Sequence, residues 1–218
     1  EQNVESEDGN NVYLTIDETI QSICEKYMQK GVEDNNVLNK GVCIAMDVNT
    51  GAILAMVTTD GYDLNNPYEL SAKDKKKIKS TAKSKQAEAE SAALSNMWRN
   101  KAVADTYMPG SVFKMCVASA ALEENLVNEK TSFTCTGSIE VEGETIHCSN
   151  IAGHGTQNFV EVISNSCNPA FIQIGQMLGA GKFRQYYQGF GFSDKTGIDL
   201  PGEAEDSFWK EGKMGGYI

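Results

Sequence analysis

The chain has 218 residues, 40% of them hydrophobic, which suffices for one sizeable globular domain or two small ones. Its formal net charge of −11 argues against binding to nucleic acid and against charge-driven binding to an anionic membrane surface. No apolar stretch approaches the roughly 18 residues that span a bilayer, and the acidic, Asn-rich start is not typical of a signal peptide, so no membrane anchor is expected within these residues.

The first organised segment is predicted to be a strand followed by a helix. Residues 12–17 alternate between apolar and polar side chains, and the stretch before them, residues 1–11, is expected to be a linker or tail. Asp17 is suited to cap a helix that runs through Ile20, Ile23 and Tyr27.

A hairpin and a helical insertion are predicted next. Residues 41–47 and 52–58 have the composition of strands, and the turn between them ends at Gly51. The polar segment that follows, about residues 69–96, contains a lysine-rich cluster and is expected to be an exposed helical insertion with a solvated face.

The stretch around residue 111 is predicted to be a turn that leads into a helix. Pro109 cannot donate a backbone hydrogen bond, and Gly110 tolerates unusual dihedral angles. Ser111 is therefore expected at the helix entrance, with Lys114 on the same face three residues later. The run 115–122 is apolar on every side, which indicates a buried helix.

A serine beside a lysine can form a catalytic pair. A lysine whose pKa is lowered by burial can be neutral and can take the serine proton, while free N–H groups at the helix start can bind an oxyanion. The pattern S-x-x-K is short and occurs by chance, so a capping serine and a surface lysine are the alternative.

A second polar pair, Ser166 and Asn168, is predicted to lie in a loop between the apolar helices 159–163 and 171–178. The hydroxyl could move a proton, and the amide could hold both a lysine and a substrate carbonyl. The alternative is that both residues only cap the following helix.

Several motifs, in this order and spacing, resemble those of class B penicillin-binding proteins, the D,D-transpeptidases of peptidoglycan synthesis. The resemblance implies an α+β fold with an antiparallel sheet and helices on both sides, of which residues 12–218 form a part that is incomplete at the C-terminus. It also implies Ser111, Lys114, Ser166 and Asn168 as catalytic residues. The motifs are residues 13–17, 47–56, 100–102, 107–114, 165–171, 189–191 and 196–203.

The same resemblance implies a reaction, partners and a location. Ser111 would be acylated by a D-Ala-D-Ala stem peptide and would pass the acyl group to an acceptor amine, and β-lactams would acylate it stably. A cell-wall glycosyltransferase is an expected partner, and the extracytoplasmic face of the membrane is the expected location, in a sporulation or cell-division role of a Gram-positive bacterium. The alternatives are a carboxypeptidase or β-lactamase-like hydrolase, a β-lactam sensor, and a noncatalytic scaffold.

The family's third motif, K-[ST]-G, is expected beyond Ile218. Lys195-Thr196-Gly197 has the same letters, but it lies in a segment that is a structural turn in the family, so no catalytic role is assigned to it. Residues 1–218 alone are therefore expected not to turn over substrate.

Cysteines and histidines gather in one window, about residues 133–155. Cys135, Cys148 and His154 are the preferred ligands of a structural zinc ion, and His147 is the weakest candidate because an extended segment turns neighbouring side chains to opposite faces. A Cys135–Cys148 disulfide and unrelated side chains are the alternatives. Cys167 is expected to be buried and inert. The remaining cysteines, Cys24, Cys43 and Cys116, are expected to be core thiols.

Overall fold

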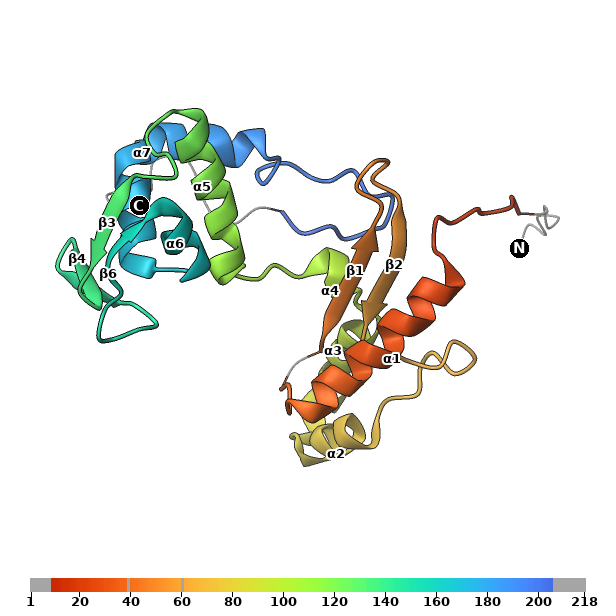
Figure 1. Ribbon diagram of the computed structural model, residues 1–218. Coiled ribbons are helices and arrows are strands. Elements are labelled where there is room, and N and C mark those ends of the chain that lie inside the picture. The colour runs from red at the N-terminus through yellow and green to blue at the C-terminus, as the bar shows by residue number, and fades with distance from the viewer. Residues whose placement is uncertain (1–8, 39, 60, 206–218) are drawn as a thin grey trace, which may run out of the picture. The chain divides into compact units, whose positions relative to one another are not determined.

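The computed structural model describes residues 9–38, 40–59 and 61–205. The chain divides into two compact units, Glu1–Asp105 and Thr106–Ile218, and each is described by itself. Figure 1 shows helices and short antiparallel strands in both, which confirms the predicted α+β class. Among the described residues, no helix is both long and apolar enough to cross a bilayer.

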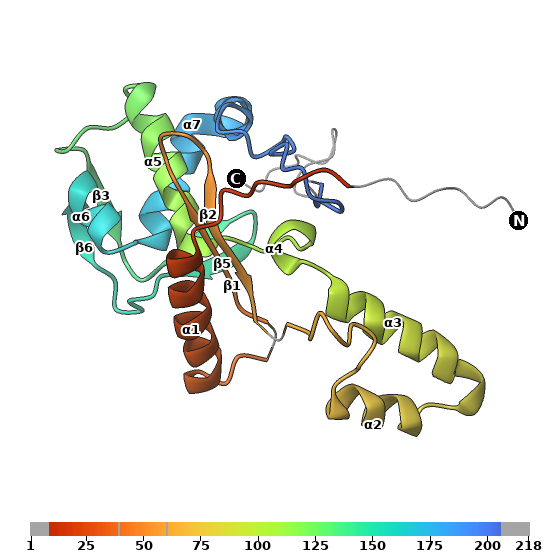
Figure 2. The same ribbon diagram turned by 90° about the vertical axis from the view of Figure 1, so that its right-hand side faces the viewer.

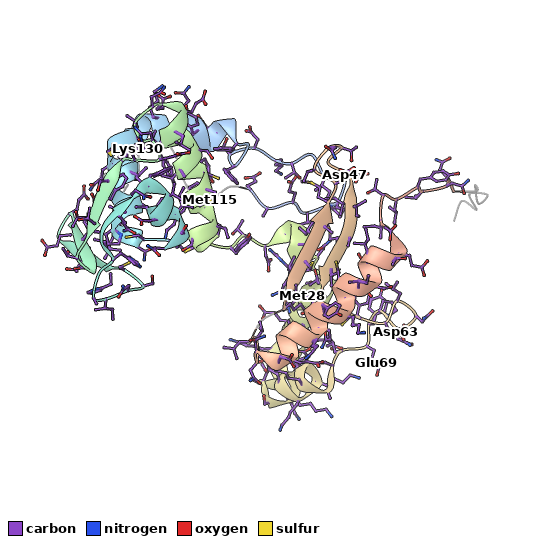
Figure 3. The ribbon with its side chains drawn as sticks, in the orientation of Figure 1. Met28, Asp47, Asp63, Glu69, Met115 and Lys130 are labelled. Atoms are coloured by element: carbon purple, nitrogen blue, oxygen red, sulfur yellow. The ribbon has the colours of Figure 1, made fainter. Side chains whose placement is uncertain are left out.

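The first unit is built on a helix and a hairpin. Helix α1 (Glu18–Asp34) begins where predicted, because the Asp17 carboxylate accepts a hydrogen bond from the Ile20 N–H at 2.9 Å. Strands β1 (Val42–Met46) and β2 (Ile53–Thr58) pair antiparallel. Asp47, labelled in Figure 3, stabilises the turn between them by accepting hydrogen bonds from the residues that follow it.

Helix α1 lies along the hairpin, as Figures 1 and 2 show. The Gln21 side chain donates to the Met56 carbonyl at 3.2 Å and accepts from the Met56 N–H at 2.8 Å. The prediction of a strand at residues 12–17 was wrong. This segment is extended and bonds to β2 only through Thr15 and Asp17, so it forms no ladder, and Tyr13 is 90% exposed.

The polar segment after β2 forms helices whose residues remain solvated. They are α2 (Ala72–Ser80), η1 (Lys83–Lys85), α3 (Gln86–Trp98) and α4 (Lys101–Ala104). None of the residues of α2 or α3 is buried. The Trp98 indole N–H, at the end of α3, donates to the Pro67 carbonyl at 2.6 Å and so fixes the base of the insertion.

The second unit has its core between two helices, α5 (Lys114–Glu123) and α7 (Asn168–Gly189). α5 was predicted to be a buried helix, and this holds for one face only. Its buried face consists of alanines, whereas Met115 and Leu122 are 47% and 45% exposed. The core cluster consists of Ala118, Ala121, Val127, Phe133, Cys135, Cys148, Phe159, Val162, Cys167, Ala170, Phe171 and Ile174.

Two small antiparallel sheets and a short helix complete this unit. Strands β3 (Ser132–Cys135) and β6 (Gly155–Asn158) form one sheet, and β4 (Ser138–Val141) and β5 (Glu144–His147) form the predicted hairpin. Its turn holds two residues with positive φ, which suits a two-residue hairpin loop. Helix α6 (Phe159–Ser164) then leads back to α7.

Candidate active site

Ser111 and Lys114 lie on two consecutive helical segments. Ser111 is in the 3₁₀ turn η2 (Gly110–Phe113), and Lys114 is the first residue of α5. Gly110 has φ 63°, a value that glycine adopts without strain, and this permits the sharp entry that the sequence predicted. The Ser111 side chain is exposed, and its hydroxyl has no hydrogen-bond partner among the described residues, so it is open to a reactant.

The Lys114 amine is held by the second polar pair. Its Nζ donates to Asn168 Oδ1 at 2.6 Å, to the Ser166 carbonyl at 2.7 Å and to Ser166 Oγ at 3.0 Å. The motif residues that are 52 and 54 positions apart in the sequence therefore meet at one atom. A surface lysine, the alternative from the sequence, does not fit these contacts.

The loop between α6 and α7 presents Ser166 and Asn168. Ser166 has φ 47°, an uncommon value for a residue other than glycine, and its half-buried side chain reaches Lys114. Cys167 occupies the N-cap position of α7 and makes no side-chain capping bond. Asn168 also donates to the His147 carbonyl at 3.0 Å. The contacts with Lys114 therefore go beyond the purely capping role that was the alternative.

The environment of Lys114 makes its ammonium group a stronger acid than that of an ordinary lysine. Burial lowers the pKa of this amine below its usual range, while the negative charges that Cys167 and Cys148 can carry oppose the shift. The ammonium lies 5.4 Å from the centre of the Phe171 ring, a position that favours the charged form. Desolvation outweighs these charge effects, so the pKa is lowered.

A second cluster lies next to this loop. Ligand atoms of Cys135, Cys148, His154 and Cys167 all lie within 4.8 Å of one another, and the three cysteines are buried. Three of these residues were predicted as ligands. The fourth, Cys167, is buried as predicted, but the sequence offered no reason to place its sulfur beside the other three, because it lies between two motif residues. His147 is exposed and does not join the cluster. Its backbone carbonyl accepts the hydrogen bond from the Asn168 side chain.

Backbone geometry brings these four ligands together. Gly153 has φ 83°, and a Cβ atom there would lie 2.4 Å from the Cys135 carbonyl oxygen. The loop that carries His154 can therefore approach β3 only with glycine at this position. The Cys148 N–H donates to the Gly137 carbonyl at 2.9 Å, and Cys148 Sγ lies 3.5 Å from Nδ1 of His154.

The thiols of the cluster differ in acidity. Burial raises the pKa of Cys167 to about 11. Burial also acts to raise the pKa of Cys148, but hydrogen bonds from the N–H groups of Asn150 and Asn168 and from neighbouring thiols together hold that pKa below its ordinary value. All six cysteines are free thiols in this structure.

The Lys195-Thr196-Gly197 segment is irregular and forms neither a strand nor a helix. The Glu203 carboxylate accepts hydrogen bonds from the Thr196 N–H at 2.7 Å and from the Thr196 hydroxyl at 2.6 Å. Gly197 has φ 79°. These contacts occupy the N–H and the hydroxyl of Thr196.

Comparison with known proteins places this geometry in a family. Stage V sporulation protein D of Bacillus subtilis is 36% identical over 197 residues, which cover 90% of this chain and 27% of that protein. Peptidoglycan D,D-transpeptidase PbpA of Mycobacterium tuberculosis is 31% identical and covers 84% of this chain and 36% of that protein. The chain thus spans about a third or less of the length of these curated relatives.

A solved structure and a family model agree with these relatives. Penicillin-binding protein 3 of Mycobacterium tuberculosis, in its apo form, superposes with a TM-score of 0.67 at 26% identity, covering 88% of this chain and 38% of that one. The family model of the penicillin binding protein transpeptidase domain matches residues 41–217, and so includes parts of both units. The family predicted from the motifs is confirmed: the chain belongs to the penicillin-binding protein transpeptidase family.

Proposed function

We propose that the protein is a serine D,D-transpeptidase that cross-links peptidoglycan stem peptides and is acylated by β-lactams. The observation that carries the proposal is the binding of the Lys114 amine by Ser166 and Asn168, one turn after an exposed Ser111. Two relatives that bear the name peptidoglycan D,D-transpeptidase support the reaction class.

In the acylation step, Ser111 is the nucleophile. Neutral Lys114 takes the hydroxyl proton while Oγ attacks the carbonyl carbon of the penultimate D-alanine. The C–N bond to the terminal D-alanine then breaks, and the leaving amine takes up a proton. A β-lactam reacts in the same way, except that its leaving amine stays covalently attached to the acyl group after the ring opens.

Ser166 can carry that proton between the lysine and the leaving amine. When Lys114 is charged, its Nζ donates a hydrogen bond to Ser166 Oγ, which lies 3.0 Å away. A neutral lysine has a free lone pair, and the same hydroxyl can then reverse its role and donate to it. An amine of a second stem peptide attacks the acyl-enzyme by the reverse route and forms the cross-link.

Labelling with a fluorescent penicillin tests this assignment in the full-length protein. We expect covalent label on Ser111, none in Ser111→Ala, and a loss of at least about 100-fold in labelling rate in Lys114→Ala, because general base catalysis contributes that much. Ser119→Ala is the matched control, since Ser119 lies on α5 and bonds only within it. Label that persists in Ser111→Ala would refute the proposal.

The acceptor separates the proposed enzyme from the alternative hydrolase. Acyl transfer to an added amino acid or stem-peptide amine, measured by mass spectrometry of the products, is the expected result. Release of the shortened peptide alone, even at high amine concentration, would identify a carboxypeptidase instead. A protein that takes neither label nor substrate would be a scaffold.

We also propose that Cys135, Cys148, His154 and Cys167 hold a structural zinc ion. Three thiolates and one imidazole are typical ligands for zinc, and Zn–S bonds of about 2.3 Å in a tetrahedron place sulfurs about 3.8 Å apart. The spread of the ligand atoms, within 4.8 Å, is compatible with this arrangement after small side-chain adjustments. Such an ion would fix Cys167 and, with it, the loop that carries the two motif residues.

Metal analysis of protein purified without chelator tests the zinc site. We expect one zinc per chain, retained in His147→Ala, because the cluster excludes His147, and lost in Cys167→Ser. A zinc-free protein whose mass shows a Cys135–Cys148 disulfide would favour that alternative and sink the metal proposal.

The setting of the whole protein follows from the same resemblance. We infer that it works on the extracytoplasmic face of the membrane beside a cell-wall glycosyltransferase; its net charge of −11 separately argues against binding to nucleic acid. The 36% identity to a stage V sporulation protein favours a sporulation role over one in cell division. Fractionation of sporulating and growing cells with an antibody against the protein would check both its location and its timing.

A further inference from the structure

Two thiols of the first unit lie side by side, outside the site described above. Cys24 belongs to α1 and Cys43 to β1, and both are half-buried. Helix α1 packs against β1, and burial, followed by the neighbouring Cys24 thiol, raises the pKa of Cys43. According to the sequence, these are the only cysteines between residues 1 and 105, so neither has a rival partner within the unit.

The packing of α1 on the hairpin explains this proximity. Gln21, three residues before Cys24, bonds to β2. Met28 lies four residues after Cys24, so all three side chains are on one face of α1. At the start of β1, a Cβ atom on Gly41 would lie 2.6 Å from the Met28 sulfur, so the helix presses closely on the chain there. Cys43 is two residues beyond Gly41 and so faces the same side of the strand.

The interface is anchored at two other points, which limits how far the thiols can separate. Both polar atoms of the Gln21 side chain bond to the Met56 backbone, and the Asp17 N–H at the start of the helix donates to the Leu54 carbonyl at 2.9 Å. These contacts hold α1 on β2, and β2 pairs with β1, so the position of α1 on the hairpin does not depend on the cysteines. The packing therefore keeps Cys24 and Cys43 on the facing sides of α1 and the hairpin, which is the placement that a disulfide requires.

We propose that Cys24 and Cys43 form a disulfide bond that ties α1 to β1. Two thiols lose two protons and two electrons, and a disulfide-containing oxidant, either a small molecule or an extracytoplasmic oxidoreductase, takes them up and becomes two thiols. Only the availability of such an oxidant depends on the proposed extracytoplasmic location; the geometry of the two thiols does not. The cross-link closes the loop of residues 24–43, restricts the unfolded chain, and so stabilises the first unit.

Peptide mapping after oxidation tests the proposal. The purified protein is incubated with oxidised glutathione, denatured, alkylated and digested with trypsin. The peptide that ends at Lys26 and the peptide of residues 41–73 each carry one of the two cysteines. We expect these peptides to be joined, to separate on reduction, and to resist alkylation before it.

Matched variants separate this bond from other thiol chemistry. Cys24→Ser should leave Cys43 free to be alkylated, whereas Cys116→Ser, which removes a half-buried thiol of the second unit, should keep the link. Ser111→Ala should also keep it, so a failure of the proposed transpeptidase activity is recognised separately. Full alkylation of both thiols after oxidation, or Cys43 joined to glutathione or to another cysteine, would overturn the proposal.

Discussion

The Lys114 amine has three oxygen acceptors and, when charged, three protons to give them. The geometry therefore matches the ammonium form, which cannot act as a base. Burial counteracts this by lowering the pKa of the amine, so the lone pair that can accept the Ser111 proton is freed at a lower pH than in an ordinary lysine. The site thus holds the lysine firmly in place while it keeps deprotonation accessible.

The acylation rate should consequently depend on pH through Lys114. The neutral fraction rises about tenfold per pH unit below the pKa, so the rate of penicillin labelling should rise with pH and level off below pH 10.5, the ordinary value for lysine. Lys114→Arg is the control, because a guanidinium stays protonated and should give little labelling at any pH. A rate that shows no rise with pH anywhere below pH 10.5 would contradict a lysine base.

At the scale of elements, one carboxylate joins the end of α5 to the second half of α7. Glu124 accepts hydrogen bonds from Lys182 Nζ and Tyr186 Oη, both at 2.9 Å. The backbone of α7 breaks at Gly179, with φ 73° and ψ 158°, just before these donors. The contact therefore holds the part of α7 that lies beyond the break.

Removal of this contact should lower the melting temperature at neutral pH. The bonds from Lys182 and Tyr186 hold the pKa of Glu124 below its usual 4.5, so its stabilisation is present above pH 4.5 and is lost as pH falls through the lowered value. Glu124→Gln should melt lower than the wild type at pH 7, and the difference should shrink below pH 4.5. Glu129→Gln, an exposed control, should melt like the wild type at both pH values.

The glycine beside the cysteine cluster offers a second element-scale prediction. Gly153→Ala should destabilise the protein by about 1–3 kcal/mol, because alanine is strained at φ 83° and its Cβ would collide with the Cys135 carbonyl. It should also reduce the zinc content. Gly143→Asn is the control, since φ 88° suits asparagine comparatively well and a Cβ there has open space. Urea unfolding compares the stability of the two variants; equal midpoints for Gly153→Ala and Gly143→Asn would contradict the prediction.

For the molecule as a whole, the two compact units should respond differently to loss of metal. Every proposed zinc ligand lies in the second unit, so a chelator should raise amide hydrogen exchange in residues 133–167 and leave α1, β1 and β2 unchanged. Hydrogen exchange followed by mass spectrometry gives this comparison in one sample. Uniform loss of protection in both units would mean that they do not unfold independently of one another.

Local features of the chain were predictable because they depend on residues close together in sequence. The Asp17 cap, the hairpin around Asp47 and the entry to the helix at Gly110 each follow from the dihedral and hydrogen-bonding preferences of a few neighbouring residues. The strand expected at residues 12–17 failed because alternation shows only that a segment is suited to a strand. Whether it forms a ladder depends on a partner strand.

The sequence by itself determined the motifs and, through their order, the family. Only the tertiary structure decided that Lys114 meets Ser166 and Asn168, and that Cys167 in place of His147 completes the cluster. The physical reason is the same for both results. These groups come from segments far apart in the chain, and the packing of α5 against α7 within one core sets which of their side chains converge.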